Sequence, residues 1–116
     1  MANKEISIKE VPIFKQYLFE YIQNNIDSDI CTNHLEDNIF IIGVCRCGFV
    51  GCSTVYLKLK ISFPKYKEKV HGTIINHHFI ERIHFNKNSE IIEYEYVNKV
   101  SPKEAPYLEE VLKIMY

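Results

Sequence analysis

The most constraining feature of this sequence is a β-prone apolar stretch that is interrupted by a compact tract of cysteines and glycines. Ile39–Ile61 holds two strongly apolar runs, and the tract Cys45–Cys52 between them reads CRCGFVGC. Three of the four cysteines and two of the four glycines of the chain fall within this tract. Two β-prone runs separated by a glycine-containing connection indicate a β-hairpin. We therefore predict a hairpin here, with a loop longer than two residues.

The two runs differ in their hydrophobic pattern. Ile39–Cys45 is almost continuously apolar, which is typical of a central strand that is covered on both faces. Cys52–Ile61 alternates between apolar and polar residues, which is typical of a strand with one face in water. The apolar positions of this second run are Val55, Leu57, Leu59 and Ile61.

Amphipathic patterns predict a helix near each end of the chain. From Ile13 to Asn25, apolar residues recur at spacings of three and four, after a proline (Pro12) that suits a first helical turn. Ser101 and Pro102 are typical of a second helix start. Pro106 falls in the next turn. The alternative is therefore a regular helix that begins at Pro106 instead of at Ser101. The expected buried stripe of this helix is Tyr107, Leu108, Val111, Leu112 and Met115.

The remaining segments predict turns and further strands. Asp27–Asn38 is polar and acidic, and we expect a loop with at most a helical turn. Val70–Ile75 and Phe79–Phe85 predict either one bent strand or two short ones. Asn86–Ser89 predicts a turn, and Ile91–Val97 a further strand. Residues 1–10 fit either a frayed end or a short first strand.

This order of elements predicts an α+β fold in a single domain spanning residues 1–116. We expect an antiparallel sheet of four to five strands, with the N-terminal and C-terminal helices packed on one face. The apolar share of 47% and the charged share of 25% are those of an ordinary globular protein. No apolar run approaches the roughly 20 residues of a membrane span, and the start of the chain does not resemble a signal peptide. We expect a cytoplasmic bacterial protein whose cysteines stay reduced.

The cysteines allow a zinc site. Zinc ligands usually come as two C-x₂₋₄-C pairs, whereas Cys45, Cys47 and Cys52 have the spacings C-x-C and C-x₄-C. Cys31 and His34, which precede the hairpin, could supply a further ligand. Free cysteines also pack as small hydrophobic residues. Zinc bound by the three hairpin cysteines with Cys31 or His34 is therefore one hypothesis, and thiols without a metal are the other.

Other kinds of chemistry find little support. A thiol enzyme would need a histidine beside a cysteine of low pKa, and no motif provides one, so we expect no catalytic residues. The tract lacks the glycine pattern of a phosphate-binding or dinucleotide-binding loop. A net charge of −1 gives no reason to expect nucleic acid.

Charge is distributed unevenly along the chain. Lysines gather in residues 58–69, and glutamates dominate residues 90–110. A solvated surface explains this pattern, and electrostatic complementarity to a protein partner explains it as well. Glu93 and Glu95 share one strand face, and with exposed Tyr94 and Tyr96 beside them they would form a partner-binding surface.

Two resemblances bear on function. The tract CRCGFVGC, followed by a β-strand, resembles the CxCGxxGC hairpin of small uncharacterised bacterial proteins, where it also lies between two strands of a compact α+β domain. The size and the Ile, Lys, Asn and Tyr-rich composition resemble immunity proteins encoded beside bacterial polymorphic toxins, including contact-dependent inhibition systems. The even charge balance departs from the strongly acidic surface of many nuclease inhibitors.

The second resemblance implies a non-enzymatic cytoplasmic protein that binds and neutralises one cognate toxin. The alternative is a small structural or regulatory module that binds zinc through the Cys45, Cys47 and Cys52 cluster. The sequence indicates no oligomeric state.

Overall fold

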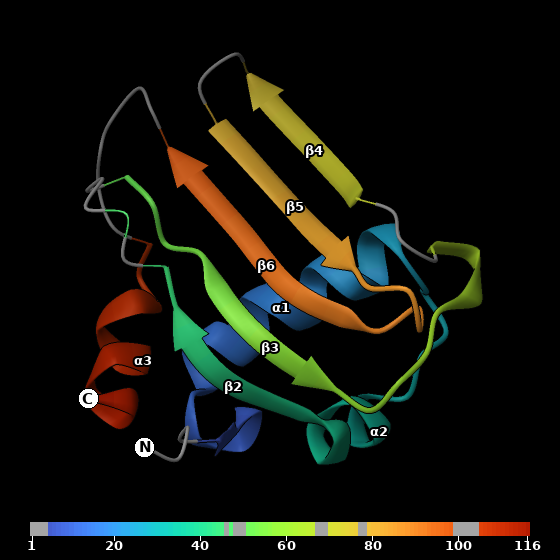
Figure 1. Cartoon of the computed structure of the whole chain (residues 1–116), viewed down its shortest axis with the longest axis horizontal. Coiled ribbons are helices and arrows are strands. Elements are labelled where there is room, and N and C mark those ends of the chain that lie inside the picture. The colour runs from blue at the N-terminus through green and yellow to red at the C-terminus, as the bar shows by residue number, and fades with distance from the viewer. Residues whose placement is uncertain (1–4, 46, 48–50, 67–69, 77–78, 99–104) are drawn as a thin grey trace.

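The computed structural model describes residues 5–45, 47, 51–66, 70–76, 79–98 and 105–116. These residues form an α+β fold built on an antiparallel sheet with the strand order β1-β2-β3-β6-β5-β4. The sheet lies in front of α1 in Figure 1, and α3 lies beside it. The elements are β1 (Ile6–Ser7), α1 (Pro12–Asn25), α2 (Thr32–Asn38), β2 (Ile39–Val44), β3 (Val55–Leu59), β4 (Val70–Asn76), β5 (Phe79–Phe85), β6 (Ile91–Asn98) and α3 (Leu108–Met115), with 3-10 turns at Ile8–Glu10 and Pro64–Tyr66.

The predicted N-terminal helix is confirmed as α1. Pro12 occupies its first position, where the missing backbone N–H costs no hydrogen bond. The apolar spacing turns one face of the helix to the sheet, with Phe14, Leu18 and Ile22 fully buried. Ile13, at the edge of this stripe, is 42% exposed.

The predicted hairpin is confirmed as the antiparallel pair of β2 and β3. Along β3 the expected alternation holds, because the side chains at Val55, Leu57 and Leu59 are buried and those between them are exposed. β2 is hydrogen-bonded on both sides, to β1 and to β3, but the prediction that it is covered on both faces is wrong. β2 lies next to the short edge strand β1, and a register shift between Ile41 and Gly43 leaves Ile42 38% exposed.

The other half of the sheet is an antiparallel meander. Of the two alternatives for residues 70–85, the structure has two paired strands, β4 and β5. The predicted turn at residues 86–89 connects β5 to β6, and Asn86 Oδ1 accepts the backbone N–H of Asn88 at 2.9 Å and of Glu90 at 3.0 Å. Ser89 adopts a left-handed conformation with φ of 64°. The described sheet thus has the expected strands, and the two-residue β1 extends it by one.

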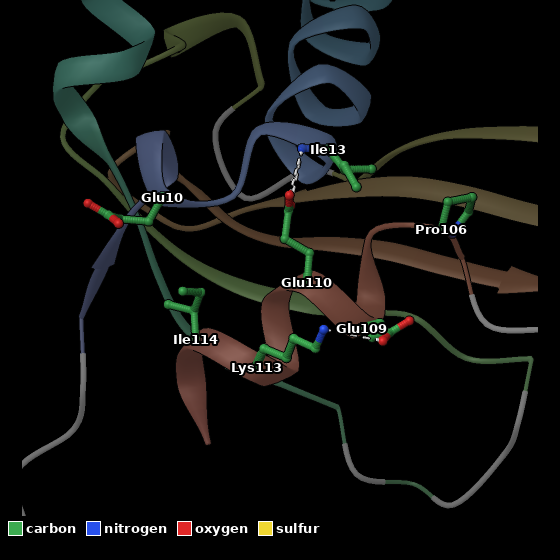
Figure 2. A pocket seen from close by; sticks show the side chains of 7 residues that line it. All are labelled: Glu10, Ile13, Pro106, Glu109, Glu110, Lys113 and Ile114. Atoms are coloured by element: carbon green, nitrogen blue, oxygen red, sulfur yellow. Dashed lines mark hydrogen bonds and ion pairs between the residues drawn. The ribbon is translucent and has the colours of Figure 1, made fainter.

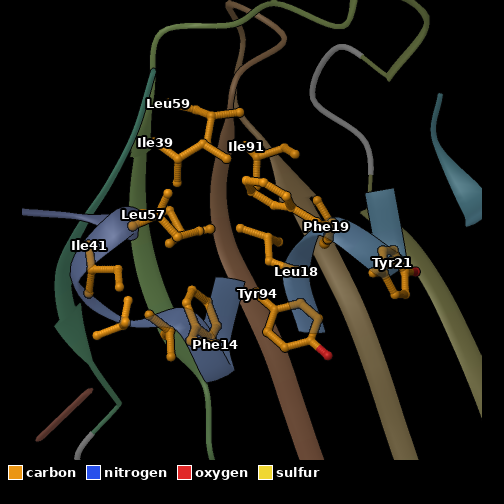
Figure 3. Packing of buried hydrophobic residues seen from close by; sticks show 14 of the residues in the cluster. Phe14, Leu18, Phe19, Tyr21, Ile39, Ile41, Leu57, Leu59, Ile91 and Tyr94 are labelled. Atoms are coloured by element: carbon orange, nitrogen blue, oxygen red, sulfur yellow. The ribbon is translucent and has the colours of Figure 1, made fainter. Parts of the chain in front are cut away.

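The hydrophobic core fills the space between α1 and the sheet. In Figure 3, Phe14, Leu18 and Phe19 of α1 point toward strand residues that include Leu57 and Tyr94. The rings of Phe14 and Tyr94 meet edge-on, with centroids 5.8 Å apart. Burying a side chain of this size stabilises the fold by roughly 1.5–3 kcal/mol.

The C-terminal helix joins the same core. The expected stripe is confirmed for Tyr107, Leu108, Val111 and Met115, which are all buried, and Leu112 packs against them. The Tyr107 ring lies 5.0 Å from that of Phe14. The helix starts at Leu108, after Pro106, and the proposed start at Ser101 lies outside the described residues.

The segment that was expected to be a loop contains α2. Its residues are polar, and Leu35 is the one buried side chain of this helix. A single apolar anchor produces no periodic pattern, so sequence reasoning could not distinguish it from a loop. Within the described part of the chain, no helix is long and apolar enough to cross a bilayer.

Candidate functional site

The candidate site lies on the sheet face opposite α1, which we call the open face (Figure 1). Two groups of polar side chains gather there. One is a thiol cluster made of Cys45, Cys47 and Cys52, and the other is a charged cluster made of Arg82, His84, Glu93 and Glu95.

The sheet anchors both ends of the thiol cluster. Cys45 directly follows β2, and its backbone N–H donates to the Thr54 carbonyl at 2.9 Å. Cys52 forms an isolated antiparallel bridge with Val97 of β6. The next residue, Ser53, donates its N–H to the Tyr96 carbonyl at 2.8 Å. The two cysteines are therefore held by backbone hydrogen bonds, and their separation depends on the sheet.

The three sulfur atoms lie close together. All are within 4.8 Å of one another, with Cys45 and Cys52 half-buried and Cys47 exposed. No disulfide joins any of the four cysteines, all of which are among the described residues. Burial raises the pKa of the Cys52 thiol, although hydrogen bonds with Thr54 oppose this shift. The Cys52 Sγ–Thr54 Oγ1 distance is 3.4 Å.

The expected fourth zinc ligand does not join this cluster. Cys31 immediately precedes α2 and His34 lies within it, and both are exposed. Helix α2 leads into the start of β2, whereas Cys45 follows its end (Figure 1). A strand of six residues spans roughly 20 Å. Among the described residues, the structure therefore groups Cys45, Cys47 and Cys52 without Cys31 or His34.

The charged cluster is organised by cross-strand pairing of β5 and β6. Arg82 faces Glu95 in the register, and its Nε and Nη2 atoms each donate to one Glu95 carboxylate oxygen at 2.9 Å. His84 faces Glu93, with its Nε2 atom 2.9 Å from Glu95 Oε1 and 3.5 Å from Glu93 Oε2. The Glu95 carboxylate is thus the shared acceptor of this cluster.

The two glutamates respond differently to this environment. Partial burial would raise the pKa of the Glu95 carboxyl, but hydrogen bonds from Arg82 and His84 lower it below its usual range. Burial raises the pKa of Glu93, and the positive charges of His84 and Arg82 offset this shift only in part.

Tyr56 lies between the two clusters. It pairs with Glu93 across β3 and β6, and it is 36% exposed. A hydrogen bond with the Cys45 side chain, followed by partial burial and the nearby Glu93 charge, raises the pKa of the Tyr56 hydroxyl. The thiol cluster, Tyr56 and the charged cluster therefore form a continuous strip across the open face.

The expected partner-binding tyrosines do not belong to this strip. Tyr94 is fully buried and contacts Phe14 and Tyr107, and its hydroxyl donates to Glu81. Tyr96 is half-buried, with its ring 6.0 Å from that of Tyr107. Neighbours along a strand point to opposite faces. Glu93 and Glu95 lie on the open face as expected, but the prediction that Tyr94 is exposed beside them is wrong.

Sequence reasoning missed Arg82, His84 and Tyr56. The sequence held a partial signal for Arg82, because residues at equal distance from a hairpin turn lie opposite each other. With the turn at residues 86–89, this rule alone would place Arg82 opposite Glu93. The register shift between His84 and Phe85 instead pairs Arg82 with Glu95 and His84 with Glu93. Tyr56 could not be placed, because the pairing of β3 with β6 joins strands that are distant in sequence. The adjacent histidines His77 and His78 lie outside the described residues.

Two of the hollows on the described surface bear on function. One, of about 280 Å³, is lined on the open face by Ile42, Ile92, Lys58 and Lys60 among others. The other, of about 390 Å³, lies between α1 and α3 and is lined by Glu110 and Lys113 among others. Figure 2 shows the Glu110 carboxylate pointing at the Ile13 backbone nitrogen. This carboxylate is already used as a helix cap, so we regard the second hollow as structural.

Comparison of the chain with models of protein families, with curated proteins and with solved structures gives no match. The geometry of the open face is therefore the basis for a functional assignment.

Proposed function

We propose that this chain is a non-enzymatic bacterial binding protein that docks a protein toxin on the open face and so neutralises it. The observation that carries the proposal is a set of exposed apolar side chains among charged residues on that face. Ile42, Tyr56 and Ile92 are 38%, 36% and 42% exposed. Well-packed interfaces place such anchors at their centre and polar groups around them.

The charges of the open face favour a protein partner over a small molecule. Lys58 and Lys60 line the hollow beside Ile92, and Glu93 and Glu95 follow along β6. The paired Arg82 compensates the charge of Glu95. A surface with both signs of charge and scattered apolar anchors suits complementary docking, in which charge selects the partner and increases the association rate.

Co-expression with the product of the adjacent gene tests this proposal, because immunity proteins are encoded beside their toxins. We expect a stable complex that survives purification, and protection of the host from the toxin. Failure of every neighbouring gene product to form a complex would overturn the proposal.

A matched pair of variants tests the docking face. Ile92→Lys places a charge on the open face, and Ile13→Lys places the same charge at the start of α1. Both isoleucines are 42% exposed in the free chain. We expect Ile92→Lys to weaken toxin binding at least about tenfold, which corresponds to roughly 1.4 kcal/mol, and Ile13→Lys to leave it unchanged. Equal binding by both variants would show that the toxin docks elsewhere.

A further inference from the structure

We propose that Cys45, Cys47 and Cys52 bind one thiophilic divalent cation, zinc in the first instance, with the fourth coordination position left to a ligand from outside this cluster. The inference does not depend on the proposed toxin. It rests on the distances, anchoring and surroundings of the three thiols.

The sulfur positions fit a tetrahedral ion after a small adjustment. With Zn–S bonds of about 2.3 Å, two ligands of a tetrahedral site are separated by about 3.8 Å. The three sulfurs already lie within 4.8 Å of one another. The remaining contraction is about 1 Å at most, which is within the reach of a rotamer change of the cysteine side chains.

The backbone around the cluster preorganises two of the ligands. Cys45 and Cys52 are attached to the sheet by the Cys45–Thr54 hydrogen bond of 2.9 Å and by the Cys52–Val97 bridge. Cys47 is exposed and lies between them in sequence. Three ligands within eight residues close only short loops, so the entropy lost on binding is small.

Thr54 is placed to support a bound thiolate. Its Oγ1 atom lies 3.4 Å from Cys52 Sγ. When the thiol loses its proton to the metal, the hydroxyl can donate to the sulfur. Such hydrogen bonds orient metal ligands and stabilise their charge.

The chemistry of the cluster selects the cation. Among divalent cations, thiolates favour zinc and cadmium over magnesium and calcium. The nearby charged cluster also brings together His84, Glu93 and Glu95, but Arg82 forms a two-pronged ion pair with Glu95 there. The positive Arg82 repels a cation, so the sulfurs are the better site.

The first experiment measures metal content. The chain is purified without chelator in a phosphine reductant, which keeps the thiols reduced without competing as a thiol ligand. Elemental analysis should give about one zinc per chain. Cys47→Ser should abolish this content, and Cys31→Ser should retain it. Both residues are exposed cysteines, so the pair is matched. Absence of zinc, before and after incubation with zinc sulfate, would overturn the inference.

The second experiment needs no variant and remains informative if Cys47→Ser does not fold. Maleimide alkylation of the unaltered chain is followed by peptide mass spectrometry, with and without added zinc. We expect zinc to slow alkylation of Cys45, Cys47 and Cys52 at least about tenfold, because coordinated thiolates react slowly. Cys31 serves as the internal control and should react equally in both samples. If zinc changes the alkylation rate of none of the four cysteines, or if it protects Cys31 as well, a zinc site at the cluster is contradicted.

Discussion

Glu93 and Glu95 lie two residues apart on the same face of β6, yet the pKa values of their carboxyl groups shift in opposite directions. Burial raises the pKa of Glu93. For Glu95, the hydrogen bonds from Arg82 and His84 outweigh burial and lower the pKa. Two neighbouring acids therefore have opposite effects on the pH dependence of folding.

For Glu95, the contribution to stability is present above the carboxyl pKa of the unfolded chain and is lost as the pH falls through the lower folded value. We expect Glu95→Gln to destabilise the fold by about 1 kcal/mol at neutral pH, because Arg82 loses a two-pronged ionic partner. The difference in the free energy of unfolding between this variant and the unaltered chain should diminish in acid. Urea unfolding at several pH values measures this, and an effect of the same size at every pH would exclude ionisation as its cause.

For Glu93, the contribution of the carboxyl group to stability changes with pH in the opposite direction. A raised folded pKa means that the ionised carboxylate reduces stability once the pH exceeds the unfolded pKa. Glu93→Gln removes the charge and should leave the stability at neutral pH unchanged or slightly higher. The same urea series, run beside Glu95→Gln, provides the comparison. If Glu93→Gln lowers the free energy of unfolding as much as Glu95→Gln does, the ion pair of Glu93 with His84 stabilises the fold by more than the burial of the Glu93 carboxylate costs.

Glu110 of α3 caps the first turn of α1. Its carboxylate accepts the backbone N–H groups of Ile13 and Phe14 at 3.1 Å, and Val11, the residue at the N-cap position, makes no side-chain cap. We expect Glu110→Ala to lower the free energy of unfolding by about 1–2 kcal/mol. Glu109→Ala, which removes an exposed neighbour paired with Lys113, should change it by less than about 0.5 kcal/mol. Thermal unfolding compares the two variants, and equal losses would refute the cap.

The Tyr107 hydroxyl donates to the Ser53 carbonyl inside the core, and Ser53 Oγ accepts the Ala105 N–H at 2.8 Å. Tyr107→Phe removes the first of these bonds and leaves a buried carbonyl without that donor. We expect a loss of about 1–2 kcal/mol in urea unfolding. Tyr116→Phe, at a residue that is 65% exposed, should have an effect below about 0.5 kcal/mol. Similar losses for the two variants would mean that the Ser53 contact contributes little.

Alkaline pH should unfold the chain through its buried tyrosines. Burial raises the pKa of both Tyr94 and Tyr107 in the folded state. Stability is therefore complete below the pKa of an unfolded tyrosine and decreases as the pH rises above it. We expect the tyrosinate absorbance of these two residues to appear together with unfolding seen by circular dichroism. In Tyr94→Phe, the loss of stability per pH unit should be smaller. Ionisation of both residues while the chain remains folded would contradict this prediction.

The parts of the fold that could be predicted from the sequence are those with a local cause. The spacing of Phe14, Leu18 and Ile22 specifies the face that α1 buries, and the alternation around Leu57 specifies that of β3. The turn at Asn86 follows from short-range hydrogen bonds of its own side chain. None of these features requires knowledge of distant partners.

The parts that could not be predicted depend on distant contacts. The pairing of Tyr56 with Glu93 joins strands that the sequence alone does not assign to each other. The face on which Tyr94 is buried depends on the position of α1. The clustering of the hairpin thiols could be predicted, because the three cysteines lie within eight residues of one hairpin connection. The distance of Cys31 from them depends on α2, which the sequence pattern does not indicate.

The cap that Glu110 places on α1 has a consequence for the order of assembly. The two partners, Ile13 and Glu110, are 97 positions apart in the chain. During synthesis on the ribosome, the first turn of α1 is made well before its capping carboxylate, which follows 97 positions later. Completion of α1 is thereby linked to the docking of α3. In a nascent chain that stops before Glu110, the backbone N–H groups of Ile13 and Phe14 lack this acceptor.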